Sequence, residues 1–172
     1  MNLPNKLTVL RIAMIPVCVA LLSFDYTVAA AVVFALAAAT DFLDGYIARK
    51  QKLVTVFGKF ADPVADKLLV LTAMICLCAR GVLPAWAVCV VAARELMVDG
   101  LRLVAVEKGV VIAAGIWGKC KTVSQFICVL CVMLLPASAF TMALVCVMTA
   151  LTVFSGVMYF IGARDVFRGG AA

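Results

Sequence analysis

Histidine is absent from this chain of 172 residues, and charged residues are scarce at 14%. Without histidine the chain has no Ser-His or Cys-His nucleophile pair, no imidazole ligand for zinc or haem, and no histidine general base. A bound metal ion would then be held by oxygen ligands, which favours hard cations such as Mg²⁺ or Mn²⁺. The eight cysteines are scattered, mostly through apolar runs, and we interpret them as small hydrophobic packing residues.

Hydrophobic residues make up 67% of the chain, and the mean hydropathy is +1.20. An ordinary soluble domain contains about 45–50% apolar residues. A soluble protein of this size could not bury so much apolar surface, so the composition predicts an all-α integral membrane protein. The length suits one membrane domain over residues 1–172, with about six spans of about 20 residues each.

The apolar runs and the turns between them predict six transmembrane helices. We expect them at about residues 7–22, from 27 into the motif described below, 58–79, 84–106, 122–135 and 140–162, with a cytosolic connection over 107–121. With both termini in the cytosol, every Lys and Arg except Arg80 lies on the cytosolic side or in the inner half of the membrane. This distribution predicts a multi-pass protein of the cell inner (cytoplasmic) membrane. It also accounts for the net charge of +6 without a nucleic-acid partner.

Four aspartates interrupt the apolar sequence between residues 41 and 66. They are Asp41, Asp44, Asp62 and Asp66. An ionised carboxylate inside a bilayer is costly unless it is paired, so such residues are functional candidates. Read as helix, the first two aspartates share a face with Gly45 and Ala48, and the last two share a face with Gly58. At about 1.5 Å of rise per residue, both faces lie in the inner half of the membrane, which predicts an active-site cavity open to the cytosol.

Carboxylates gathered in a medium of low dielectric constant repel one another, and cations are needed to keep them ionised. Two divalent ions about 4 Å apart, bridged by carboxylates, are a common device for phosphoryl-type transfer. The small residues beside the acids leave room for a bulky ligand, and Arg49 can neutralise a diphosphate. Two other interpretations stay open from these residues alone: a set of interhelical salt bridges, and a cation-coupled membrane transporter. The six short predicted spans show no inverted repeat, which is a common feature of transporters, so the transporter is the less favoured interpretation.

Residues 41–66 fit the pattern D-x2-D-G-x2-A-R-x8-G-x3-D-x3-D at every fixed position. This pattern resembles the signature of the CDP-alcohol phosphatidyltransferase family. The segments N-L-P-N-K-L-T-V-L-R-I near the N-terminus and A-R-E-L-M-V-D-G-L-R from residue 93 resemble members that use glycerol 3-phosphate as the acceptor. The resemblance covers most of residues 1–125, whereas the last two predicted spans have a generic apolar sequence.

The resemblance implies six transmembrane helices, a homodimer among membrane lipids, and two divalent cations, Mg²⁺ or Mn²⁺. It also implies a reaction, in which CDP-diacylglycerol and sn-glycerol 3-phosphate give phosphatidylglycerophosphate and CMP. Serine, inositol phosphate and phosphatidylglycerol are the alternative acceptors within the family. A phosphorylated acceptor requires a basic pocket, and the segment R-E-L-M-V-D-G-L-R favours glycerol 3-phosphate.

The resemblance also implies roles for individual residues of the motif. Asp66 is the expected general base and a shared metal ligand. The other expected metal ligands are Asp41, Asp44 and Asp62. The residues expected at the CDP site are Asn5, Thr8, Arg11, Gly45, Ala48, Arg49 and Gly58.

The phosphate of the acceptor requires cations of its own. Four basic residues of the fourth predicted span and the connection after it are candidates: Arg94, Arg102, Lys119 and Lys121. Other roles are open for the same residues. Glu95 or Asp99 could neutralise the arginines, and the lysines could anchor the chain at lipid headgroups.

Overall fold

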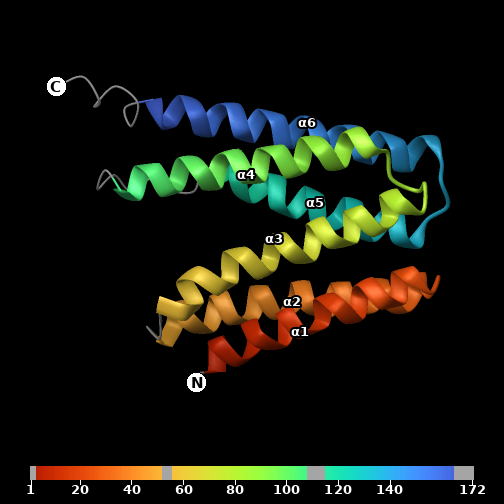
Figure 1. Cartoon of the computed structure of the whole chain (residues 1–172), viewed down its shortest axis with the longest axis horizontal. Coiled ribbons are helices and arrows are strands. Elements are labelled where there is room, and N and C mark those ends of the chain that lie inside the picture. Colours follow the sequence, from red (N-terminus) through yellow and green to blue (C-terminus); the bar gives the residue numbers. More distant parts are fainter. Residues whose placement is uncertain (1–2, 52–55, 108–114, 165–172) are drawn as a thin grey trace. The chain divides into compact units, whose positions relative to one another are not determined.

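The computed structural model of the chain is built from helices (Figure 1). It describes the backbone of residues 3–51, 56–107 and 115–164, and the side chains of residues 5–40, 61–107 and 115–164. These residues form six helices and no strand, which confirms the all-α prediction. The helices are α1 (Leu3–Ser23), α2 (Thr27–Gln51), α3 (Val56–Ala79), α4 (Ala85–Glu107), α5 (Ile116–Leu134) and α6 (Ala139–Gly162).

Among the described residues, three helices are long and apolar enough to cross a membrane. They are α1 from Asn5 to Ser23, α5 and α6. The described apolar part of α2, Thr27–Thr40, is shorter. These lengths and compositions support the prediction of an all-helical membrane protein.

The helices belong to two compact units. The first unit comprises Met1–Leu83 and Val129–Ala137, and the second comprises Pro84–Cys128 and Ser138–Ala172. The first unit therefore holds α1, α2, α3 and the end of α5, and the second holds α4, most of α5 and α6. The four aspartates of the motif belong to the first unit, and the four candidate acceptor-phosphate residues belong to the second.

In the first unit, α1 packs against both α2 and α3 (Figure 1). Large side chains fill its interior, and Phe34 of α2 and Leu69 of α3 are both fully buried. Buried small residues between them allow the helix backbones to approach closely: Ala30, Ala31, Ala37, Ala65 and Ala73. This close packing holds α1 beside the helix that carries the second half of the aspartate motif.

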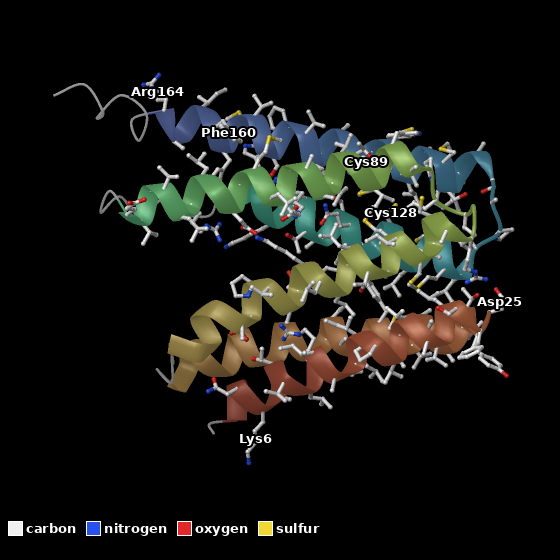
Figure 2. All side chains as sticks on the ribbon, viewed as in Figure 1. Lys6, Asp25, Cys89, Cys128, Phe160 and Arg164 are labelled. Carbon is white, nitrogen blue, oxygen red and sulfur yellow. The ribbon has the colours of Figure 1, made fainter. Side chains whose placement is uncertain are left out.

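An ion pair closes the end of the first unit where α1 turns into α2. The turn contains Asp25, whose backbone adopts a positive φ of 64°. The Arg80 guanidinium, which follows α3, lies 2.8 Å from the Asp25 carboxylate and donates to the Thr27 hydroxyl at 3.0 Å. Lys6 and Asp25 mark opposite ends of this unit in Figure 2. Asp25 therefore neutralises the one basic residue that the sequence predicts on the outer side.

In the second unit, α4 packs along α6 (Figure 1). Side chains of α5 join this pair. Trp117 of α5 lies edge-on to Phe154 of α6, with 4.8 Å between the ring centroids. The start of α6 is fixed by a capping box between Ser138 and Thr141.

The helix α5 begins at Ile116, so the predicted connection over residues 107–121 is wrong for its last six residues. The glycines and lysines of this stretch indicate a loop by local preference alone. In the structure Trp117 packs on Phe154, and Lys121 forms a buried ion pair. These tertiary contacts override the weak local preference.

Candidate active site

The first half of the aspartate motif lies on the helical backbone of α2, as its spacing predicts. Helical periodicity puts these positions on one face of α2. The side chains of residues 41–60 are outside the described part of the structure. The roles of six residues therefore stay predictions: Asp41, Asp44, Gly45, Ala48, Arg49 and Gly58.

The second half of the motif lies on α3, where Asp62 and Asp66 are one helical turn apart and half-buried. The hydroxyl of Thr8 on α1 donates a hydrogen bond to Oδ1 of Asp62. Thr8 itself is only 1% exposed. The structure therefore brings a predicted CDP-site residue against a predicted metal ligand that lies 54 residues away in the sequence.

The other two predicted CDP-site residues of α1 lie within one turn of Thr8. Arg11 is fully buried, and Asn5 is half-buried. A buried guanidinium is stable only where anionic or polar groups surround it. This part of α1 therefore carries a positive charge into the interior of the unit that holds the acids.

The predicted metal site is only partly within the described structure. Among the described side chains, no group of three or more His, Cys, Asp or Glu residues is placed to hold a metal ion. Two of the four predicted ligands, Asp41 and Asp44, are not among those side chains. The carboxylates of Asp62 and Asp66 are the described half of the predicted ligand set.

In the second unit, two of the predicted acceptor-phosphate residues form a buried ionic cluster with Glu95. Nζ of Lys121 contacts Oε1 of Glu95, and Nη1 of Arg94 lies 3.3 Å from both carboxylate oxygens. All three residues are at most 8% exposed. Glu95 therefore neutralises part of the cationic charge, which is one of the roles that the sequence leaves open. The three side chains together retain a net charge of +1.

The helix α6 fixes the other side of Arg94. Its Nη2 donates to Oγ of Ser155 at 2.7 Å. Its Nε is buried and makes no hydrogen bond within the described residues. A Cβ at Gly156 would lie 3.2 Å from Cγ of Arg94. A residue without a side chain at this position lets the stem of Arg94 lie directly against α6.

The other two predicted acceptor-phosphate residues are more accessible. Arg102 is half-buried, with its Nε 3.5 Å from the hydroxyl oxygen of Tyr159 and its Cζ 6.0 Å from the centroid of that ring. Lys119 is exposed. Arg102 and Lys119 can therefore meet a ligand without first leaving a buried ion pair.

The sequence gives little indication of the α6 side chains that contact these arginines. Ser155 and Tyr159 lie in a generic apolar span, 61 and 57 residues from their partners. Thr152 of the same helix accepts a buried hydrogen bond from Gln125 of α5 at 3.3 Å. In the sequence, the one indication of these partners is helical periodicity, which puts positions 152, 155, 156 and 159 on one face of a helix.

Curated relatives resemble the chain over most of its length. A CDP-diacylglycerol–glycerol-3-phosphate 3-phosphatidyltransferase of Bacillus subtilis is 48% identical over 143 residues, which cover 74% of this chain and 74% of the relative. A protein of the same name from Pseudomonas fluorescens is 41% identical and covers 82% of this chain and 76% of the relative. A probable phosphatidylglycerophosphate synthase of Mycobacterium tuberculosis is 40% identical, over 96% of this chain and 83% of the relative.

The family model of CDP-alcohol phosphatidyltransferases matches residues 1–157. The match includes the whole aspartate motif and extends into α6, beyond the part of the chain in which the sequence alone shows a resemblance. This match and the identities to the relatives confirm the prediction made from the motif. The chain belongs to the CDP-alcohol phosphatidyltransferase family.

Proposed function

We propose that the chain transfers the phosphatidyl group from CDP-diacylglycerol to sn-glycerol 3-phosphate, giving phosphatidylglycerophosphate and CMP in phospholipid biosynthesis. The observation that carries the proposal is the complete aspartate motif in a chain of this family. Relatives at 48% and 41% identity bear the name of this activity. The acceptor in their names favours glycerol 3-phosphate over serine, inositol phosphate or phosphatidylglycerol.

In the proposed mechanism, Asp66 is the general base. Its carboxylate takes the proton from the 1-hydroxyl of the acceptor, and that oxygen forms a bond to the β-phosphorus of CDP-diacylglycerol. The bond from the β-phosphorus to the bridging oxygen breaks, and CMP leaves with the bonding electron pair. Thr8 restrains the neighbouring Asp62, because its hydroxyl donates to Oδ1. Most of the gain in rate is attributed to the position of the Asp66 carboxylate beside the acceptor hydroxyl.

The donor set of the motif fits two hard divalent cations, Mg²⁺ or Mn²⁺. We assign four carboxylates to hold them: Asp41, Asp44, Asp62 and Asp66. When bound, such ions stabilise the negative charge that develops on the phosphoryl oxygens. The spacing of one turn between Asp62 and Asp66 supports the assignment, because it puts two oxygen donors on one face of α3.

The CDP moiety is assigned to residues of α1 and to residues around the aspartates. Those of α1 are Asn5, Thr8 and Arg11. The others are Gly45, Ala48, Arg49 and Gly58. Small residues leave space for a nucleotide beside the helix backbones, and a guanidinium neutralises a diphosphate with paired hydrogen bonds.

The acceptor phosphate is assigned to the basic residues of the second unit. Arg102 and Lys119 are accessible and are proposed to contact the phosphate directly. Arg94 and Lys121 are buried with Glu95, and their cluster adds its net positive charge to the same region. An acceptor without a phosphate, such as glycerol, would have no electrostatic attraction to these cations that strengthens its binding.

We place the six helices in the cell inner (cytoplasmic) membrane as one membrane domain over residues 1–172. Both termini face the cytosol, and the catalytic cavity opens to the cytosol from the inner half of the membrane. The distribution of Lys and Arg supports this orientation, because Arg80 is the one basic residue that it leaves on the outer side. We further propose that the protein acts as a homodimer.

CMP release from CDP-diacylglycerol by the purified protein in lipid–detergent micelles tests the proposal. We expect release that requires both glycerol 3-phosphate and Mg²⁺ or Mn²⁺. Release that requires serine or inositol phosphate instead would reassign the acceptor. Cation flux in proteoliposomes without nucleotide, together with no CMP release, would contradict the proposal and support a transporter.

A further inference from the structure

Two polar side chains of α6 contact the two arginines of α4. Oγ of Ser155 accepts a hydrogen bond from Nη2 of Arg94 at 2.7 Å. One turn further along α6, the hydroxyl oxygen of Tyr159 lies 3.5 Å from Nε of Arg102. The residue numbers rise together in both pairs, because α4 and α6 run parallel (Figure 1). One face of α6 therefore contacts both arginines.

Arg94 is held at both terminal nitrogens of its guanidinium, and its stem lies beside a glycine. Its Nη1 lies 3.3 Å from each carboxylate oxygen of Glu95, and its Nη2 donates to Oγ of Ser155. Its Cγ lies beside Gly156, where an added Cβ would come to 3.2 Å, closer than ordinary van der Waals contact. An arginine side chain has many rotamers and becomes ordered only where its neighbours restrict them. The contacts of Nη1 and Nη2 restrict the guanidinium of Arg94, and the absence of a side chain at Gly156 leaves room for its stem.

Tyr159 holds Arg102 through its hydroxyl and its ring. The Cζ atom of Arg102 lies 6.0 Å from the ring centroid, which is at the outer limit of a cation–π contact. The hydroxyl contact involves Nε. The terminal Nη1 and Nη2 groups, which form the fork that recognises phosphate, are not part of that contact. Tyr159 can therefore orient this guanidinium without occupying the side that binds an anion.

We propose that Ser155 and Tyr159 are positioning residues for recognition of the acceptor phosphate. They hold Arg94 and Arg102 in the orientations that attract and bind the phosphate of glycerol 3-phosphate, without contacting the acceptor themselves. This inference rests on the proposed function, in which these arginines serve the acceptor. Selectivity for a phosphorylated acceptor is then determined partly by α6, whose sequence is otherwise that of an ordinary apolar span.

Steady-state kinetics of Ser155→Ala and Tyr159→Phe test the inference. We expect the KM for glycerol 3-phosphate to rise about tenfold in Ser155→Ala, because a buried hydrogen bond to a charged group is lost. A rise of about threefold is expected in Tyr159→Phe, since its contact is longer and the ring is retained. The kcat and the KM for CDP-diacylglycerol should stay within about twofold. We also expect inorganic phosphate to compete with the acceptor, and its inhibition should weaken by the same factors.

Matched variants separate positioning from a general effect on folding. Ser155→Thr keeps the hydroxyl and should keep the KM of the unsubstituted protein. Gly156→Ala leaves both hydroxyls in place but displaces Arg94, so it should raise the KM for glycerol 3-phosphate. Gly162→Ala on the same helix meets nothing within 4 Å and is its control. Tyr26→Phe, at an exposed residue of the first unit, is the control for Tyr159→Phe.

An unchanged KM for glycerol 3-phosphate in both Ser155→Ala and Tyr159→Phe would overturn the inference. Equal losses for both substrates, or a fall in kcat alone, would overturn it as well, because neither is selective for the acceptor. In each of these cases the unsubstituted protein still releases CMP with glycerol 3-phosphate, and the proposed function stands. No CMP release by the unsubstituted protein would overturn the proposed function, and the inference with it.

Discussion

Both units of the protein place a charged side chain against a hydroxyl of another helix, but the charges are opposite. In the first unit Thr8 donates to the carboxylate of Asp62, and in the second Ser155 accepts from the guanidinium of Arg94. The acid of the first unit is half-buried. Glu95 of the second unit is 3% exposed and lies against two cations of the chain itself. Asp62 and Asp66 of the first unit stay partly exposed, whereas the second unit neutralises much of the charge of Arg94 and Lys121 internally.

The difference separates two uses of a charged residue in an apolar helix. A charge that the chain itself neutralises fixes the packing of helices and the orientation of side chains. A charge that a ligand neutralises binds substrate or metal. It follows that substitutions at Asp66 should damage the chemistry and leave folding intact, whereas substitutions at Glu95 should damage folding.

Asp66→Asn is expected to have the largest effect and tests the chemical half of the comparison. The amide cannot accept the proton of the acceptor, so kcat should fall by at least about 100-fold. CDP-diacylglycerol should still bind, as measured by titration calorimetry in micelles, and the melting temperature should stay close to that of the unsubstituted protein. Activity within tenfold of the unsubstituted protein would remove Asp66 from the role of base.

Glu95→Gln tests the structural half of the comparison. Loss of the carboxylate leaves Arg94 and Lys121 buried without this counter-charge, which is expected to cost about 3–5 kcal/mol of unfolding free energy. Denaturation in detergent micelles measures the change. Glu107→Gln, at an exposed residue of the same helix, is the control and should lie within about 0.5 kcal/mol of the unsubstituted protein. Equal stability of the two variants would exclude Glu95 as an internal counter-ion.

Thr8→Val keeps the shape of the side chain and removes the donor to Asp62. A hydrogen bond to a charged group contributes about 1.5–3 kcal/mol, so kcat/KM should fall about tenfold or more. Thr8→Ser should retain the activity. The control is Thr72→Val, because the hydroxyl of Thr72 donates to the backbone of its own helix. Indistinguishable activity of the two valine variants would show that orientation of Asp62 by Thr8 is unimportant.

Asp25→Asn should have the smallest effect, because the Asp25 side chain is 81% exposed. An exposed ion pair contributes less than about 1 kcal/mol to stability, and CMP release should not change. Arg80→Gln should have the same small effect, and the double variant should add little to either. A loss of several kcal/mol in either single variant would contradict this assignment and give the turn a structural role like that of Glu95.

Hydrophobic patterning predicted most of the helices closely and failed at α5. The predicted ends at residues 79 and 162 are the observed ends of α3 and α6. The start of α5 was predicted too late because the contacts that stabilise its first turns lie on other helices. Trp117 packs on Phe154 of α6, and Lys121 pairs with Glu95 of α4. No sequence pattern within residues 116–121 indicates that these residues contact α4 and α6.

The candidate site was predictable where its residues are concentrated in a motif. The spacing of the aspartates and the resemblance at α1 identified both Thr8 and Asp62, which the structure brings into contact. The partners of the arginines on α6 were not predictable in this way. A single hydroxyl in an apolar helix commonly bonds its own backbone, as Thr149 does with the carbonyl of Val145. The contact of Ser155 with Arg94 depends on tertiary packing and is visible only in the structure.

The ion pair between Asp25 and Arg80 has an electrical consequence in the proposed orientation. Asp25 cancels the one basic charge on the outer side, so the net charge of +6 lies on the cytosolic side and in the inner half of the membrane. Moving one unit charge across a membrane potential changes its energy by about 2.3 kcal/mol per 100 mV. A cell whose interior is negative therefore holds the protein in this orientation through its cytosolic charge. The neutral turn at the outer end experiences no net force from the same potential.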